Sequence, residues 1–188
     1  MSHMIRKTLE PFSVHGYCQG ISRIYTEADL LGRWSVLFFY PADFSFVCPT
    51  ELKDLGEHFE GFEAEDCNVF SVSMDTHFVH KAWADASQTI RDLPFVMLAD
   101  PAGKLTKQFG VLMEEEGQAL RATFVMNPAG EVVLYEIHDL GIGRSASELL
   151  RKVQAARFVA EHGDQVCPAA WQPGADTLTP SLDLVGLL

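Results

Sequence analysis

Cysteine is scarce in this sequence, and no two cysteines form a C-x-x-C pair. The 188 residues contain four widely separated cysteines, Cys18, Cys48, Cys67 and Cys167. So few thiols in a chain of this length do not make a disulfide-stabilised secreted scaffold. The missing C-x-x-C pair excludes a zinc ribbon and the usual dithiol redox motif. We therefore expect each cysteine to serve either chemistry or packing.

Basic residues and long apolar runs are also lacking. Lys and Arg number 14 against 26 Asp and Glu, which gives a net charge of −12, and no cluster of basic residues relieves it locally. Nucleic acid and anionic membrane surfaces are therefore not expected partners. The longest apolar stretch, Trp34 to Pro41, is too short to cross a bilayer, and the N-terminus lacks the layout of a secretory signal. We expect a soluble, cytoplasmic protein.

The composition that remains, 47% hydrophobic and 21% charged, is typical of a globular chain with one domain. We interpret residues 1–4 as vector-derived, residues 5–163 as the domain and residues 164–188 as a C-terminal tail. The tail is rich in Pro and Gly, yet it carries apolar side chains that it cannot bury alone. We expect these to pack on a partner subunit; they are Trp171, Leu182, Leu184, Val185, Leu187 and Leu188.

Strands and helices alternate along the chain, which indicates an α/β fold. The apolar run Ser35–Tyr40 predicts a central strand covered on both faces, and the helical spacing of apolar residues after Pro49 predicts a helix through Phe62. The other expected elements are strands at 69–74, 95–98, 122–126 and 132–137, with the last two forming a hairpin, and two helices, one at 77–86 and one that opens at Ser145 and is closed by Gly163.

Cys48 is the residue whose position suggests chemistry. It follows a buried strand and opens a helix, where unpaired backbone N–H groups and the helix dipole favour a thiolate, the nucleophilic form of cysteine. Ser45 can offer a hydroxyl to the thiolate, and Pro41 can exclude water without adding a donor. The alternative from local physics is that Cys48 is a small buried hydrophobic residue.

A family resemblance favours the first interpretation. The pattern Pro41-x-x-x-Ser45-x-x-Cys48 resembles the active-site signature of the peroxiredoxins, and specifically the branch of bacterial alkyl hydroperoxide reductase C. The similarity continues in the right order over almost the whole chain. It includes Asp75-Thr76-His77-Phe78, His80-Lys81-Ala82-Trp83, Arg121-Ala122-Thr123-Phe124-Val125, Gly141-Ile142-Gly143-Arg144, Val166-Cys167-Pro168-Ala169 and Ser181-Leu182-Asp183-Leu184-Val185-Gly186.

The resemblance implies a thioredoxin-like α/β fold with an N-terminal extension and a C-terminal tail that packs on a partner subunit. It implies a typical two-cysteine peroxidase that reduces hydrogen peroxide and organic hydroperoxides, with no metal or cofactor of its own. Cys48 matches the peroxidatic cysteine, and Cys167 matches the resolving cysteine, supplied by the other subunit. Pro41 and Ser45 match the signature, Arg121 the guanidinium beside the thiolate, and Arg144 and Glu51 a supporting shell.

The resemblance also implies a flavoprotein disulfide reductase or a thioredoxin-like protein as reductant, and homodimers assembled into a ring, expected to be a decamer. The Gly-Gly-Leu-Gly loop and the Tyr-Phe pair of the over-oxidation-prone subgroup are missing here. We therefore predict prompt disulfide formation and resistance to inactivation by excess peroxide.

Several alternatives remain open from the sequence. A general thiol-disulfide oxidoreductase is disfavoured by the missing C-x-x-C pair, and a ring-forming holdase chaperone can coexist with catalysis. Cys18 and Cys67 match no role, and burial is the better interpretation of Cys67. His77 and His80 share a helix face but lack a third metal ligand, so no metal site is predicted.

Overall fold

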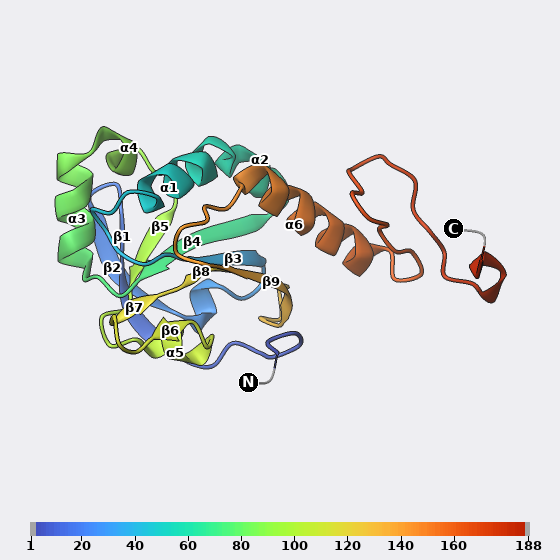
Figure 1. Ribbon diagram of the computed structural model, residues 1–188, viewed down its shortest axis with the longest axis horizontal. Helices are drawn as coiled ribbons and strands as arrows, with labels where there is room; N and C mark the ends of the chain where they lie inside the picture. Colours follow the sequence, from blue (N-terminus) through green and yellow to red (C-terminus); the bar gives the residue numbers. More distant parts are fainter. Residues whose placement is uncertain (1–2, 187–188) are drawn as a thin grey trace.

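The computed structural model describes residues 3–186 and consists of a seven-stranded mixed sheet with helices packed against it (Figure 1). The strands lie in the order β2-β1-β5-β4-β3-β8-β9, so the expected α/β class is confirmed. Their bounds are β1 Ser13–Cys18, β2 Ile21–Thr26, β3 Trp34–Phe39, β4 Cys67–Ser73, β5 Val96–Ala99, β8 Arg121–Met126 and β9 Val132–His138.

Three parallel strands form the middle of this sheet, and an antiparallel hairpin flanks them on each side. Strands β3, β4 and β5 run parallel, while the hairpins are β8–β9 beside β3 and β1–β2 beside β5. All six residues of β3 are buried, as expected for a central strand. The helices are α1 Cys48–Glu57, α2 Phe59–Ala64, α3 His77–Ala86, α4 Gln88–Arg91, α5 Lys104–Gln108 and α6 Ala146–Glu161; a small second sheet pairs β6 Leu112–Met113 with β7 Gln118–Ala119.

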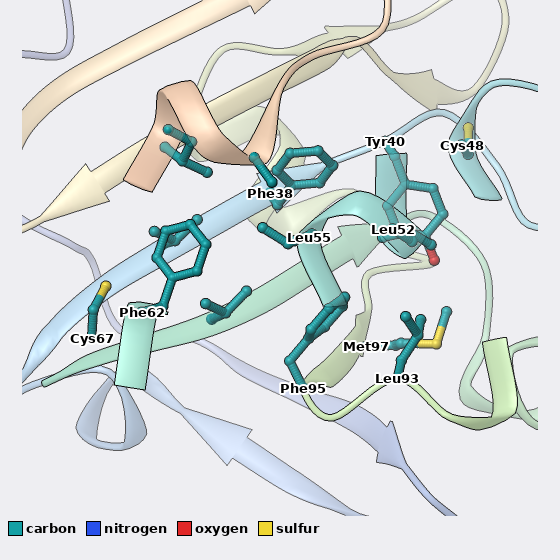
Figure 2. Packing of buried hydrophobic residues seen from close by; sticks show 14 of the residues in the cluster. Phe38, Tyr40, Cys48, Leu52, Leu55, Phe62, Cys67, Leu93, Phe95 and Met97 are labelled. Atoms are coloured by element: carbon teal, nitrogen blue, oxygen red, sulfur yellow. The ribbon is translucent and has the colours of Figure 1, made fainter. Parts of the chain in front are cut away.

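Alternate side chains of the strands feed two separate cores, because successive residues of a strand point to opposite faces. Val36 and Phe38 of β3 pack with residues of α1, α2, α3 and α6 on one face. Leu37 and Phe39 pack on the other face, against α5 and the segments around it. Figure 2 shows part of the first core, with Cys48 at one end of the cluster near Tyr40 and Leu52. The candidate nucleophile therefore lies at the margin of a packed core.

One expected helix boundary is wrong. The helix expected from Pro49 through Phe62 is broken at His58, whose backbone leaves the helical region at φ −101° and ψ 4° and whose ring bonds the Asp54 carbonyl at 2.9 Å. The last helix ends at Glu161 with His162 as its C-cap, so Gly163 follows directly, at the position expected of a glycine that closes a helix. Its start is as expected, since Ser145 is the N-cap and its side chain accepts from the Glu148 N–H.

The hairpin β1–β2 lies where the family resemblance implies only an N-terminal extension. Its turn residues Gln19 and Gly20 both have positive φ, 46° and 86°, which is the backbone that a tight two-residue hairpin requires. Most side chains of β2 are exposed, and its sequence does not alternate clearly between apolar and polar residues, so the usual sequence signal of a strand is missing there. Met4, included among the expected vector residues, packs against the second core; Met1 and Ser2 lie outside the described residues.

The C-terminal tail leaves the end of α6 and extends away from the sheet (Figure 1). Trp171 is buried against the chain's own α6, which differs from the expectation that it packs on a partner. Leu182 and Val185 are 90% and 78% exposed, while Leu187 and Leu188 lie outside the described residues. Among residues 3–186, no helix has the length and apolarity to span a membrane.

Candidate active site

Cys48 is the first residue of α1, the helix that follows β3 after a short loop, as its sequence context predicts. Pro49 follows it in the first turn, where the missing N–H of proline costs no helical hydrogen bond. The Cys48 side chain has no exposed surface. Its sulfur accepts a hydrogen bond from Arg121 Nη1 at 3.2 Å, so a buried cation faces the thiol directly.

The backbone N–H groups of the first turn are used differently from what the sequence suggests. The Thr50 and Glu51 N–H groups donate to the Val47 carbonyl, at 3.0 Å and 3.2 Å. Within residues 3–186, the one hydrogen bond to the Cys48 sulfur comes from Arg121. The helix dipole still acts at this position, but the direct donor to the sulfur is a side chain 73 residues away in the sequence.

Glu51 holds two arginines at the site. Its Oε2 accepts from Arg121 Nη1 at 2.7 Å and from Arg144 Nη2 at 3.1 Å. Its Oε1 accepts from the Arg144 backbone N–H at 2.9 Å and from Arg144 Nε at 2.8 Å. Arg121 Nε also donates to the Leu140 carbonyl at 2.6 Å. The guanidinium of Arg121 is therefore fixed from two sides with one nitrogen against the sulfur.

Arg144 is tied further into the core. Its Nη1 donates to Thr123 Oγ1 at 3.2 Å, and its guanidinium carbon lies 3.4 Å from the centre of the Phe38 ring. Stacking on an aromatic face suits a guanidinium, which is weakly hydrated and planar. The three charged residues Glu51, Arg121 and Arg144 are all buried, so their orientation is set by one another and not by solvent.

The charges of this cluster shift the pKa values of its members. Burial raises the pKa of Glu51, but the hydrogen bonds and charge of Arg144, with the charge of Arg121, outweigh burial and hold that pKa below its ordinary value. Burial lowers the pKa of Arg144. For Arg121 burial acts in the same direction, but the contacts with Cys48 and Glu51 outweigh it and leave the pKa raised. Glu51 is therefore an ionised carboxylate and Arg121 a permanent cation.

Pro41 and Ser45 both lie in the loop between β3 and α1. Pro41 is buried, in keeping with a role in excluding water. Ser45 Oγ donates to the Ala42 carbonyl at 2.8 Å, so its proton serves the loop itself and not the thiolate as the sequence suggests. Ser45 is half-buried, and its oxygen can still accept a hydrogen bond.

A second buried cluster in the same loop is not evident from the sequence. Asp43 accepts from the Tyr40 hydroxyl at 2.7 Å and faces His80 Nδ1 at 2.7 Å, while its own N–H donates to Asp75 Oδ2 at 2.8 Å. The Tyr40 hydroxyl points away from Cys48 (Figure 2). Burial and the charge of Asp43 raise the pKa of Tyr40 well above its ordinary value, so its hydroxyl remains a donor. The signal in the sequence is one acidic residue in a loop that has no other charged side chain.

Cys167 is half-buried on the side of α6, where its sulfur lies 3.8 Å from the Ala155 carbonyl. Arg151 Nη1 donates to the Trp171 carbonyl at 2.8 Å, and the Trp171 ring packs on Phe158 with ring centres 5.1 Å apart. These contacts hold the start of the tail on α6. Burial raises the pKa of the Cys167 thiol, although the positive charge of Arg151 opposes that shift.

The remaining cysteines and histidines take no part in this arrangement. Cys67 is buried at the start of β4, and burial raises its pKa to about 12, so the packing interpretation of Cys67 is confirmed. Cys18 is half-buried at the end of β1, and all four cysteines are free thiols. His77 stacks on His15 with ring centres 4.3 Å apart, while His80 faces Asp43. Residues 3–186 contain no group of three side chains able to hold a metal ion.

Two family models match the chain. Residues 6–135 match the AhpC/TSA family, and residues 155–186, which include Cys167, match the C-terminal domain of 1-Cys peroxiredoxin. Together these matches cover the candidate nucleophile, Arg121 and the tail.

Curated relatives and solved structures agree with these models. The chain is 51% identical to alkyl hydroperoxide reductase C of Salmonella typhimurium over 183 residues, 97% of this chain and 98% of that protein, and 49% identical to the protein of the same name from Bacillus subtilis. It resembles the crystal structure of Enterococcus faecalis AhpC with TM-score 0.87 and 53% identity, over 89% of this chain and 100% of that one. A reduced 2-Cys peroxiredoxin of Plasmodium vivax matches with TM-score 0.91 and 27% identity, over 97% and 96%.

The expected thioredoxin-like fold is confirmed, because the peroxiredoxin structures that match the chain have a thioredoxin fold. By both sequence and structure, the chain belongs to the AhpC/TSA family of peroxiredoxins.

Proposed function

We propose that Cys48 is the peroxidatic cysteine of this thiol-dependent peroxidase. Its thiolate attacks one oxygen of a hydroperoxide, the O–O bond breaks, and the leaving oxygen takes a proton to become water or an alcohol. Cys48 is then a sulfenic acid, oxidised by two electrons. The observation that carries this proposal is the hydrogen bond from Arg121 Nη1 to the Cys48 sulfur, at 3.2 Å inside the protein.

Arg121 has two roles in the proposed step. Its positive charge stabilises the thiolate before attack, and its fixed N–H groups can receive the negative charge that develops on the leaving oxygen. Glu51 and Arg144 act through it, because their contacts set the position of the guanidinium. Since the sulfur has no exposed surface, a peroxide reaches it only when neighbouring side chains move.

The second proposed step is condensation with Cys167 of a second subunit. The Cys167 thiol attacks the Cys48 sulfenic acid, an S–S bond forms and water leaves. Support comes from the position of Cys167 in its own chain, beside Ala155 of α6. Ala155 lies nine positions after Ala146, the residue of α6 whose N–H donates to Asp54 of α1. At the rise of an α-helix, Ala155 is therefore about 14 Å along α6 from this contact with the helix that carries Cys48. We propose that the tail of a second copy, residues 164–188, instead brings its own Cys167 to Cys48.

The enzyme acts on hydroperoxides and requires a reductase to regenerate its thiols. We propose that it accepts hydrogen peroxide and organic hydroperoxides, and that a flavoprotein disulfide reductase or a thioredoxin-like protein reduces the disulfide. We also propose homodimers that assemble into a ring, with the decamer as the expected form, and residues 5–163 as the peroxidase domain. The proposed location is the cytoplasm, because reducing compartments keep thiols free.

A non-reducing gel tests this mechanism directly. Wild type, Cys48→Ser and Cys167→Ser are each treated with one equivalent of hydrogen peroxide and quenched with a thiol-alkylating reagent. We expect a covalent dimer only for wild type, and consumption of peroxide by every form that retains Cys48.

Two results would count against the proposal. Continued peroxide turnover by Cys48→Ser would exclude Cys48 as the nucleophile, and a covalent dimer in Cys167→Ser would exclude Cys167 as its partner. Cys18→Ser is the matched control, because this residue is also a half-buried thiol but lies outside the site. It should form the dimer as wild type does.

A further inference from the structure

The loop of residues 40–47, called here the active-site loop, combines buried residues, among them Tyr40 and Asp43, with two largely exposed phenylalanines. Phe44 and Phe46 are 56% and 93% exposed. The Ser45 hydroxyl is used inside the loop, on the Ala42 carbonyl. Phe44 has a φ of +55°, in the left-handed region that a bulky L-residue rarely adopts, so the loop is strained at this point. The Phe44 ring packs on Trp83 of α3 with ring centres 5.8 Å apart, and one further contact, made by a buried side chain, holds this backbone in place.

That contact is Asp43, the residue next to the strained one. Three groups from three different places converge on it: the Tyr40 hydroxyl, His80 Nδ1 of α3 and, through the Asp43 N–H, Asp75 after β4. Asp75 is itself fixed by the Ser73 hydroxyl at 2.9 Å. Asp43 and His80 have no exposed side-chain surface, so water does not compete for these bonds.

His80 can hold Asp43 in only one way. Its Nε2 is buried and has no hydrogen-bond partner among residues 3–186. A proton on Nε2 would therefore be a buried unpaired donor, which is costly, whereas a bare nitrogen there costs less. The favoured tautomer carries its proton on Nδ1 and donates it to the Asp43 carboxylate, 2.7 Å away.

We propose that His80 is a positioning residue that, through Asp43, keeps the active-site loop folded and thereby limits how fast oxidised Cys48 can reach Cys167. The contact joins α3 to the loop that ends at Cys48, five residues after Asp43. While it persists, the sulfur stays beside Arg121; when it breaks, the strained loop and the first turn of α1 are free to rearrange. The inference rests on the proposed function, because it concerns that function's second step.

The test compares two replacements of His80. His80→Asn keeps an N–H donor close to the position of Nδ1, while His80→Leu removes the donor and keeps an apolar side chain. Each variant is mixed with one equivalent of hydrogen peroxide, quenched with acid at successive times, and assayed for the Cys48–Cys167 disulfide. We expect the first-order rate constant of disulfide formation to rise at least about tenfold in His80→Leu, because that variant loses one charge-assisted hydrogen bond. In His80→Asn the rate constant should stay within about threefold of wild type.

A rate constant distinguishes this role from a general structural one. Loss of folded protein lowers the yield of disulfide but leaves the first-order rate constant of the folded fraction unchanged. Tyr40→Phe removes a second hydrogen bond to Asp43 and keeps the aromatic ring in the core, so it should also accelerate disulfide formation. This variant tests the proposal even if His80→Leu fails to fold. Asp85→Asn, at an exposed ion pair on the same helix, is the control and should leave the rate unchanged.

The inference is overturned if His80→Leu or Tyr40→Phe, correctly folded, forms the disulfide at the wild-type rate or more slowly. That outcome differs from failure of the proposed function, in which wild type itself forms no Cys48–Cys167 disulfide.

Discussion

Glu51→Gln is the perturbation that most directly tests how the buried charges support the site. Glu51 accepts four hydrogen bonds, two on each carboxylate oxygen, and all four come from the two arginines. Glutamine keeps one acceptor oxygen and places an NH₂ group where the other oxygen was, so two bonds are lost and donors face donors. The charge that balances Arg121 and Arg144 is lost as well.

The structure sets the size of the expected effect. Each bond to a charged group contributes about 1.5–3 kcal/mol, and removal of one partner of a buried ion pair costs about 3–5 kcal/mol. The two ranges refer to the same contacts and are not added together, so we expect the free energy of unfolding to fall by about 3–5 kcal/mol. Urea unfolding followed by circular dichroism at pH 7 measures it. Glu57→Gln on the same helix is the control: its ion pair with Lys53 is exposed, and its loss should cost less than about 1 kcal/mol.

The same variant has a defined pH dependence. The pKa of Glu51 is lowered in the folded state, so its stabilising contribution is complete above the ordinary carboxylate pKa and disappears as pH falls through the folded value. The stability difference between wild type and Glu51→Gln should therefore be constant above about pH 5 and shrink below it. A stability difference below about 1 kcal/mol at pH 7, or a difference that grows in acid, would refute the assignment of Glu51 as an ionised carboxylate that holds the two arginines.

Three further predictions concern other parts of the molecule. Arg121→Lys keeps the charge but loses the planar fork, so the second-order rate constant for peroxide should fall about 10²-fold in stopped-flow assays; a change below threefold would contradict direct contact with the Cys48 sulfur. Burial raises the pKa of Cys67 to about 12 from 9.0, so the stabilising contribution of the neutral thiol is complete below pH 9 and declines above it. Urea unfolding should therefore show wild type losing about 2–3 kcal/mol more stability between pH 9 and 11 than Cys67→Val does. An equal dependence of stability on pH in the two proteins would refute this. Trp171→Ala removes the ring that packs on Phe158, so limited proteolysis should cut the tail at least several-fold faster than in wild type, and equal cleavage would show that Trp171 does not hold it.

The local elements can be predicted from the sequence because their signals are local. The apolar run before Tyr40 specifies a buried strand, Pro49 specifies a helix start, and Asn127-Pro128-Ala129-Gly130 specifies the turn of the β8–β9 hairpin, where Gly130 adopts a φ of 79°. The break at His58 escapes prediction, since apolar residues keep helical spacing on both sides of it. The β1–β2 hairpin escapes it because its outer strand is mostly exposed and lacks a clear alternation.

The position of Cys48 at a helix start follows from the sequence alone, and the family motif names the residues expected around it. The three-dimensional fold was needed to establish which atoms meet: Arg121 and not a backbone N–H reaches the sulfur, Glu51 joins two arginines 70 and 93 residues away, and His80 holds Asp43. The physical reason is that strand order and register bring distant segments together, whereas propensity, capping and periodicity act over a few residues.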